Sequence, residues 1–293
     1  MKTYSSKLLL FGEHIVIKGA RALATPYAGF QGSWQWRPDD LSLQQSLPSF
    51  LMYIKAKTVL AELMDCETFE KDLERGLYFE ANIPTGYGLG SSGALCAAVY
   101  DRYAKDPVDR SDLEAIPALQ ETLARMESFF HQSSSGVDPL VCYMDQTLVL
   151  QRGEVPQVTN IKATHEDAPL FLVDTNQSRK TAPFVEHFLS QYEKTAFRSV
   201  LEEQLLPANE AAINALLSVD KVSLQVSFRQ ISQFQFEHFQ RMIPASVAPL
   251  WQEGLEAGDF SLKLCGAGGG GFMLGLAKDA QTLERLQLGP SVL

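Results

Sequence analysis

Ile83-Pro84-Thr85-Gly86-Tyr87-Gly88-Leu89-Gly90-Ser91-Ser92-Gly93 carries the most specific structural signal in this chain. Its glycines let the backbone turn tightly and come close to a ligand. The serines open a predicted helix from Ser91 to about Ala104, whose first N–H groups and positive dipole end favour a phosphate. Before the turn, residues 77–83 have the aromatic and apolar content of a strand that stops at Pro84. The segment therefore predicts a strand, a phosphate-binding turn and a helix.

The same turn matches two other nucleotide-binding patterns only in part. Gly88, Gly90 and Gly93 satisfy G-x-G-x-x-G, but the motif lies far from the N-terminus and no strand ending in an acidic residue follows the helix. We therefore reject a dinucleotide site. A Walker A loop is rejected because the chain has no Gly-Lys-Ser/Thr. For this motif by itself, an ordinary glycine turn that caps a helix remains an alternative.

A second polar segment runs from Glu127 to Asp138, Glu-Ser-Phe-Phe-His-Gln-Ser-Ser-Ser-Gly-Val-Asp. Glu127 falls at the edge of an apolar helical stripe formed by Leu119, Leu123, Met126 and Phe130. A carboxylate there is partly desolvated, so a cation partner is expected. Asp138 follows a small polar turn, as expected of a residue directed into a cleft. Taken alone, Glu127 also fits a border residue in water, and Asp138 a turn residue before Pro139.

The third segment is a glycine cluster, Lys263-Leu-Cys-Gly-Ala-Gly-Gly-Gly-Gly-Phe272. Five glycines in the six positions 266–271 are costly in chain entropy, so bare backbone must be needed there. Close approach to a phosphate and close approach to a neighbouring helix both meet that need. A dinucleotide site is rejected again, because strand-like residues follow the cluster in place of a helix.

The composition limits the classes of partner. The chain has 293 residues, of which 45% are hydrophobic and 20% charged, as in an average globular protein. Its net charge of −10 argues against nucleic acid or an anionic membrane as a partner, because both need a basic surface. No apolar run approaches the length of a membrane span. The four cysteines are scattered, which predicts reduced thiols and a cytoplasmic location.

The pattern along the chain predicts two domains, residues 1–160 and 161–293, with the boundary in the polar stretch around 153–169. In the first we expect strands at 7–11, 22–24, 140–144 and 147–151. We also expect a helix from the capping box at Ser111, restarted by Pro117. In the second we expect a strand at 169–173, helices near 183–205, 208–218, 224–242 and 246–257, and strands at 261–265 and 272–277. This content predicts an α+β fold.

In this order and at these separations, the segments resemble the GHMP kinase superfamily, and within it the mevalonate kinases most. Residues 7–19 (KLLLFGEHIVIKG) are similar to the N-terminal signature K-x-x-L-x-G-E-H-x-V-x-x-G. Residues 84–93 resemble the phosphate loop P-x-G-x-G-L-G-S-S. Glu127 and Asp138 have the E-x₁₀-D spacing, and residues 263–271 resemble K-L-T-G-A-G-G-G-G. The resemblance spans nearly the whole chain. It departs from the pattern at Cys265, Gly93 and Tyr87.

The resemblance implies a two-domain α+β fold, with a ribosomal S5 domain 2-like N-terminal domain and a ferredoxin-like C-terminal domain. It implies transfer of the γ-phosphoryl group of ATP to the 5-hydroxyl of mevalonate, a step of isoprenoid biosynthesis. It further implies that Asp138 accepts the hydroxyl proton, that Lys7 stabilises developing negative charge, and that Ser92 and Glu127 hold Mg²⁺. The residues expected to bind ATP are Gly86, Gly88, Leu89, Gly90, Ser91, Ser92, Gly93, Gly268 and Gly269.

The mevalonate contacts are expected at two places. Glu13 and His14 follow the lysine strand within the N-terminal signature. Arg179 lies in the polar segment after the first strand of the second domain, and its guanidinium fork suits a carboxylate. The alternatives are a hydrogen-bonded structural histidine at position 14 and a solvated basic pair at Arg179 and Lys180.

Two other functions stay open. One is a sister kinase, above all phosphomevalonate kinase, although Gly12-Glu13-His14 favours mevalonate as the substrate. The other is a catalytically inactive nucleotide-binding regulator on the same fold, against which the presence of Lys7, Glu127 and Asp138 together argues. The sequence does not determine the oligomeric state, and a homodimer is compatible with it.

Overall fold

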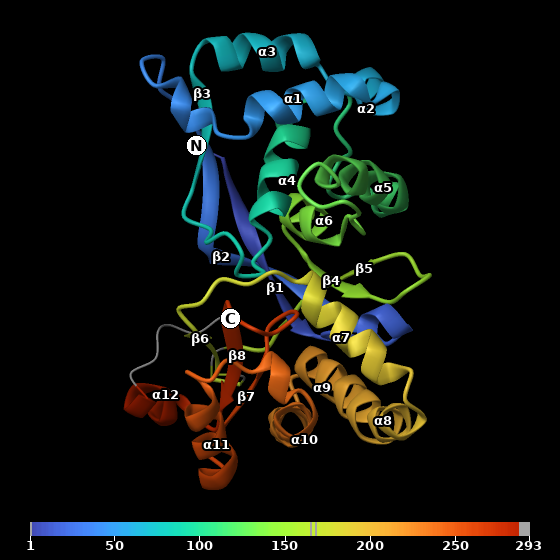
Figure 1. The fold of residues 1–293 in the computed structure, drawn as a ribbon, viewed down its shortest axis with the longest axis vertical. Helices are drawn as coiled ribbons and strands as arrows, with labels where there is room; N and C mark the ends of the chain where they lie inside the picture. Colours follow the sequence, from blue (N-terminus) through green and yellow to red (C-terminus); the bar gives the residue numbers. More distant parts are fainter. Residues whose placement is uncertain (1, 165, 168, 287–293) are drawn as a thin grey trace. The chain divides into compact units, whose positions relative to one another are not determined.

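The computed structural model describes residues 2–164, 166–167 and 169–286 (Figure 1). The chain forms two compact units, each made of separate segments. The first unit contains residues 1–7, 25–84 and 89–146, and the second contains residues 8–24, 85–88 and 147–293. These interleaved units differ from the contiguous division at residues 160 and 161, which stays a prediction.

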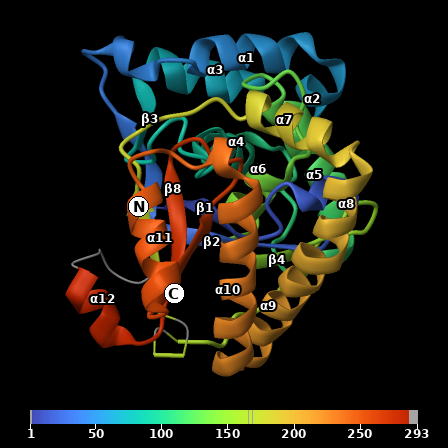
Figure 2. The same ribbon diagram turned by 60° about the horizontal axis from the view of Figure 1, so that its bottom comes forward.

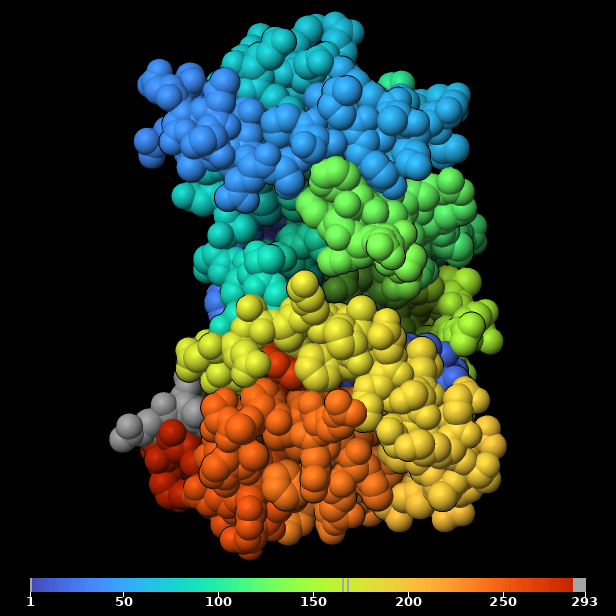
Figure 3. Space-filling model, viewed as in Figure 1, coloured from blue at the N-terminus to red at the C-terminus, as the bar shows by residue number. Residues whose placement is uncertain are grey.

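The first unit is mainly helical. Its helices and short 3₁₀ segments are η2 (Leu41–Gln44), α1 (Leu47–Ala56), α2 (Thr58–Leu63), α3 (Cys66–Glu74), α4 (Ser91–Tyr103), η3 (Leu113–Ala115), α5 (Ile116–Glu127) and α6 (Val137–Met144). Helix α4 contacts both α5 and α6. It can approach them closely because small buried residues, Ala94, Ala97 and Ala98, lie along it. Helices α1 and α2 form part of the outer surface of this unit, as the blue atoms of Figure 3 show.

One sheet has the strand order β1-β2-β4-β5, with β3 also paired to β2. Its strands are β1 (Thr3–Phe11), β2 (Ala22–Trp36), β3 (Leu77–Ala81), β4 (Thr147–Leu150) and β5 (Gln157–Thr159). In the first unit β2 pairs antiparallel with β3, with Trp34 opposite Phe79. In the second unit the start of β2 pairs antiparallel with β4, with Leu23 opposite Val149. The long strand β2 thus has partners in both units.

The second unit contains a separate antiparallel sheet in the order β6-β8-β7. Its strands are β6 (Leu170–Asp174), β7 (Phe260–Leu264) and β8 (Phe272–Ala277). Every residue of β7 and β8 is buried, including Ser261 and Lys263 of β7, and β8 has no polar side chain. Helices α10 and α11 contact β7, and α9 lies beside α10 (Figure 2).

The helical segments of the second unit are η1 (Ile15–Lys18), α7 (Ala182–Tyr192), α8 (Thr195–Val200), the π-helical η4 (Leu201–Leu205), α9 (Leu206–Ser218), α10 (Lys221–His238), η5 (Gln240–Met242), α11 (Ala248–Ala257) and α12 (Ala280–Leu286). The core of this unit includes Trp251, Phe171, Phe188 and Phe228. Burying side chains of this size stabilises the fold by roughly 1.5–3 kcal/mol each. Among the residues that the structure describes, no helix is both long and apolar enough to cross a membrane.

Most of the predicted elements are present, and the α+β class is confirmed. Two local predictions were wrong. Residues 140–144, predicted as a strand, belong to helix α6, and the side chain that caps the segment after residue 111 is Asp112 rather than Ser111. The restart at Pro117 is confirmed, because this proline lies in the first turn of α5.

Candidate active site

In the first unit, Lys7 and Asp138 form an ion pair. Lys7 Nζ lies 2.9 Å from Asp138 Oδ1, and the Lys7 side chain is only 10% exposed. Strand β1 positions Lys7, whose backbone N–H donates a 2.9 Å hydrogen bond to the carbonyl oxygen of Leu89. Asp138 lies in the first turn of α6, where the helix dipole favours a carboxylate. The two residues that the sequence predicts to act on the reacting hydroxyl are therefore in contact.

Two glycines of the predicted phosphate loop make room for this pair. Gly90 has φ +73°, and a Cβ there would lie 2.9 Å from Lys7 Cγ. A Cβ at Gly93 would lie 2.9 Å from the carbonyl carbon of Asp138. Both distances are shorter than ordinary side-chain contacts, so bare backbone is needed at both positions. Leu89 between the glycine turns is buried, and Ser91 is the first residue of α4.

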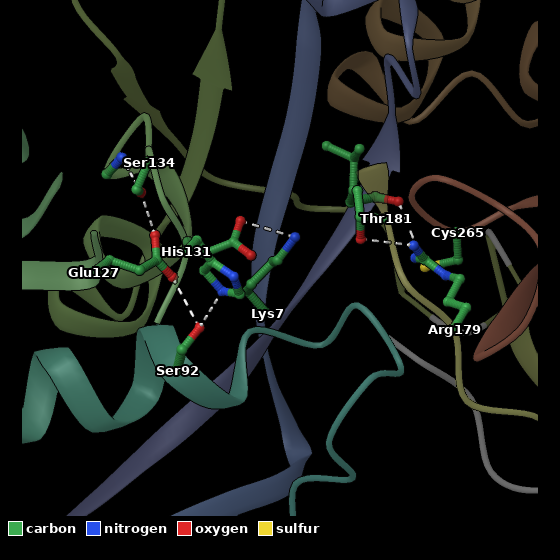
Figure 4. A network of polar contacts seen from close by, with 11 residues as sticks. Lys7, Ser92, Glu127, His131, Ser134, Arg179, Thr181 and Cys265 are labelled. Carbon is green, nitrogen blue, oxygen red and sulfur yellow. Dashed lines mark hydrogen bonds and ion pairs between the residues drawn. The ribbon is translucent and has the colours of Figure 1, made fainter. Parts of the chain in front are cut away.

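Glu127 is the most deeply buried carboxylate near this ion pair, with 4% of its surface exposed. Its Oε1 accepts a hydrogen bond from the hydroxyl of Ser92 at 3.1 Å, and its Oε2 accepts one from the hydroxyl of Ser134 (Figure 4). Burial, followed by the negative charge of Asp138, raises the pKa of Glu127 to about 7. The two hydroxyls and the positive charge of Lys7 oppose that rise. The predicted desolvation of this carboxylate is confirmed.

Ser92 and Glu127 fit the ligand chemistry of Mg²⁺. Both offer oxygen, which a hard cation prefers, and Ser92 is in the first turn of α4. Within the described residues, no three or more His, Cys, Asp and Glu side chains gather as a metal-binding group. Mg²⁺ is usually bound through one or two carboxylates together with substrate phosphates, so a hydroxyl beside one buried carboxylate is a suitable donor set.

In the second unit, Arg179 lies against two of the glycine-rich segments. Its backbone N–H donates to the carbonyl oxygen of Gly86 at 3.0 Å, and its Nε donates to that of Gly270 at 3.2 Å. A Cβ would lie 2.4 Å from Arg179 Nη2 if built on Gly88, and 2.6 Å if built on Gly266. The guanidinium therefore occupies space that side chains at these glycines would fill. Its Nη1 also donates to the hydroxyl of Thr181 (Figure 4).

Gly268 and Gly269 are packed against protein atoms of the second unit. A Cβ on Gly269 would lie 1.9 Å from the Phe184 ring, and one on Gly268 would lie 2.7 Å from Met242 Cβ. The backbone N–H of Gly269 donates to the carbonyl oxygen of Met242 at 2.6 Å. Helix packing thus accounts for these two glycines. Their contact with ATP stays a prediction.

Glu13 and His14 are both buried in the second unit, with 3% and 5% of their surfaces exposed. Glu13 forms an ion pair with Lys263, which is fully buried on β7. His14 has φ +63°, a strained conformation for a residue with a side chain. Its Nε2 lies 3.1 Å from the carbonyl oxygen of Ala267, and its ring contacts the ring of Phe188 in a tilted arrangement. Burial lowers the pKa of His14 to about 4.

Four residues that contact the predicted site were not assigned from the sequence: His131, Ser134, Thr181 and Lys263. One of them had a usable signal, since His131 follows Glu127 by four residues, a spacing that brings side chains to one side of a helical segment. The other contacts depend on how distant segments approach. Of the departures from the family pattern, Cys265 is buried and Tyr87 packs its ring on Phe272.

Comparison with known proteins shows which family the chain resembles. Residues 53–146 match the family described as "GHMP kinases N terminal domain". The chain therefore resembles the GHMP kinases in sequence, and the match lies mostly within the first unit. Relatives and solved structures narrow the resemblance further.

The relatives include proteins named mevalonate kinase. The one from Aeropyrum pernix is 27% identical over 71% of this chain and 62% of its own length. The one from Thermococcus sibiricus is 25% identical over 94% of this chain and 89% of its own length. The resemblance to mevalonate kinases recognised from the sequence motifs is thus confirmed.

Solved structures confirm the fold. The L. major mevalonate kinase in complex with R-mevalonate superposes with a TM-score of 0.67 at 16% identity, covering 97% of this chain and 89% of that one. The Streptococcus pneumoniae phosphomevalonate kinase in complex with phosphomevalonate and AMPPNP gives a TM-score of 0.63 at 16% identity, covering 98% and 94%. At these identities the likeness supports the two-domain fold and does not distinguish between the two substrates.

Proposed function

We propose that this chain transfers the γ-phosphoryl group of ATP to the 5-hydroxyl of mevalonate. The class of reaction follows from the family: the chain is an ATP-dependent phosphotransferase that acts on an alcohol. The observation that supports the assignment of residues is the ion pair of Lys7 with Asp138, 2.9 Å apart, beside the start of α4. Mevalonate as the acceptor is supported by the names of the relatives in Aeropyrum pernix and Thermococcus sibiricus.

Phosphoryl transfer mainly requires positioning and charge stabilisation, and the residues of the first unit suit both. Asp138 accepts the proton of the attacking hydroxyl. Lys7 stabilises the negative charge that develops on the hydroxyl oxygen and the transferred group. Ser92 and Glu127 would hold Mg²⁺, which would neutralise phosphate charge. The N-terminal N–H groups of α4 bind phosphate oxygens, since they lack partners within the helix.

We assign mevalonate recognition to residues of the second unit. His14 Nε2 faces a carbonyl oxygen and must donate to it, so the neutral ring has an acceptor at Nδ1. Among the described residues, Nδ1 is buried without a hydrogen-bond partner. That atom suits a substrate hydroxyl. Arg179 supplies positive charge for the carboxylate, and Glu13, which is paired with Lys263, is the other residue that we assign to the substrate. A cytoplasmic location and a homodimer remain predictions.

The test is a substrate panel of mevalonate, phosphomevalonate, galactose and homoserine, with ATP and Mg²⁺, measuring ADP release. We expect ADP release with mevalonate and much less with the other three. Asp138→Asn serves as the control for contaminating kinases. The variant is purified in the same way as the wild type and should be nearly inactive, so any ADP release that remains comes from contaminants. A preference for phosphomevalonate would assign the sister reaction, and no turnover with any acceptor would favour a nucleotide-binding regulator.

A further inference from the structure

The hydroxyl of Ser92 is shared between two partners. Ser92 Oγ lies 3.1 Å from Glu127 Oε1 and 3.1 Å from His131 Nε2 (Figure 4). His131 lies just beyond the end of α5, and its backbone N–H donates to the carbonyl oxygen of Glu127 at 3.2 Å. The imidazole is therefore held on the same side as the carboxylate. It is also exposed to solvent, which can satisfy its other nitrogen.

Because the Ser92 hydroxyl has a single hydrogen, its other hydrogen bond determines whether His131 Nε2 is a donor or an acceptor. A serine hydroxyl donates once, and in this structure it donates to Glu127. His131 Nε2 must then be the donor to Ser92 Oγ. A divalent cation held by Ser92 and Glu127 would take a lone pair of the hydroxyl oxygen, so the hydroxyl proton would have to turn away from it. Of the two side chains within hydrogen-bond distance of Ser92 Oγ described above, Glu127 would then be a ligand, and His131 Nε2 would have to accept the proton's hydrogen bond.

We propose that His131 positions the metal-binding hydroxyl of Ser92 by exchanging these roles. It donates from Nε2 in the metal-free chain and accepts at Nε2 in the metal-bound chain, with its ring hydrogen then on Nδ1. This inference rests on the proposed Mg²⁺ ligands, Ser92 and Glu127. Hydrogen bonds to metal ligands generally orient them and raise metal affinity, and their loss typically costs roughly 10–100-fold in affinity.

The first test reads the tautomer directly. The ¹⁵N and ¹H resonances of the histidine rings are recorded for the full chain, alone and with Mg²⁺ plus a non-hydrolysable ATP analogue. His131→Gln identifies the His131 signals by their disappearance. We expect the attached hydrogen to move from Nε2 to Nδ1 when Mg²⁺ and the analogue bind. A hydrogen that stays on Nε2 in the loaded protein overturns the proposal.

The second test measures metal affinity without turnover, by Mn²⁺ electron paramagnetic resonance in the presence of the same analogue. His131→Phe should weaken Mn²⁺ binding by about 10–100-fold, because phenylalanine neither donates nor accepts. His131→Gln should retain most of the affinity, since an amide can do both. His238→Phe, the same change at a histidine on α10, is the matched control and should bind Mn²⁺ as the wild type does.

The outcomes separate this inference from the proposed function. Equal Mn²⁺ affinity in the wild type and His131→Phe overturns the role of His131 and leaves the proposed metal ligands intact. No Mn²⁺ binding by the wild type, or unchanged binding by Glu127→Gln, overturns the assignment of the ligands and the inference with it. Weaker binding by His131→Phe together with the tautomer change supports the proposal.

Discussion

Asp138 and Lys7 are the residues on which the proposed chemistry depends. The role of the Asp138 carboxylate can be tested by replacing one of its oxygens with an amide nitrogen. Asp138→Asn removes the proton acceptor while it keeps the shape, so we expect kcat to fall by roughly 10²–10⁴-fold. Binding of ATP, measured by calorimetry, should change little. Asp145→Asn is the matched control, because it makes the same change just after the opposite end of α6. Near-normal turnover in Asp138→Asn would remove this residue from the mechanism.

His14 should make stability depend on pH. Its pKa is about 4 in the folded chain, against an ordinary value of 6.5. Between these values the unfolded chain binds more protons, so the free energy of unfolding decreases as the pH falls from 6.5 towards 4. The full loss is about 3 kcal/mol, since one pKa unit corresponds to about 1.4 kcal/mol.

His14→Asn lacks the titrating group and should lose less stability over the same range of pH. Urea unfolding at pH 7, 6, 5 and 4.5 measures the difference between the two proteins. If both proteins show the same decrease, the buried ring of His14 does not cause it.

The family resemblance assigned Lys7 and Asp138 to the same reacting hydroxyl, and the helical period placed Glu127 at the edge of an apolar stripe, which predicted its desolvation. They did not predict Ser134 and Thr181 as hydrogen-bond partners. Serine and threonine are common in polar turns, and their local sequence does not show which carboxylate or guanidinium they meet. The partner of Glu13 was missed for another reason: it is Lys263, 250 residues away.

At the scale of elements, the close approach of α4 and α6 depends on Gly93. Alanine in a helix is normally better than glycine by about 1 kcal/mol. Here the added methyl would lie 2.9 Å from backbone atoms of Asp138 and Pro139, and overpacking of this kind costs about 1–3 kcal/mol. Backbone atoms at a helix start cannot move aside cheaply, so the overpacking should outweigh the gain.

We therefore expect Gly93→Ala to lower the free energy of unfolding by up to about 2 kcal/mol and to reduce kcat by displacing Asp138. Urea unfolding and steady-state kinetics measure the two effects. Ser91→Ala, at the first residue of the same helix, adds no atom and should leave stability nearly unchanged. A more stable Gly93→Ala protein with normal kcat would show that the two helices can separate freely.

Helices and strands with a clear hydrophobic period or a clear boundary residue could be predicted from the sequence. Short segments without either could not. Residues 140–144 were predicted as a strand because a short apolar run has no period that distinguishes a strand from a buried helix. In α6 every residue from Pro139 to Met144 is buried, so the segment shows no polar face. The helices α1, α2 and α3 were not predicted from residues 47–74.

At the scale of the molecule, the buried pair of Glu13 and Lys263 joins the beginning of the chain to its last sheet. Lys263→Met leaves the Glu13 carboxylate buried without its cation, which should cost about 3–5 kcal/mol in the free energy of unfolding. The double variant Glu13→Gln with Lys263→Met removes both charges and should recover much of that loss. Denaturant unfolding of the two single variants and the double variant gives the coupling energy. Additive losses would show that the two side chains do not stabilise each other.

The interleaving of the two units has a consequence for synthesis on the ribosome. The last residue of the first unit is Gln146, so that unit can be complete while residues 147–293 are still unmade. Residues 8–24 belong to the second unit, and among them Leu8, Leu10, Phe11 and Leu23 are fully buried in the finished protein. Two of these residues have partners that are made only after residue 146, because the ring of Phe11 contacts Phe228 and Leu23 pairs with Val149 of β4. A growing chain of this protein therefore exposes an apolar segment close to its N-terminus for about half of its translation. We expect a chaperone that acts on nascent chains to bind this segment.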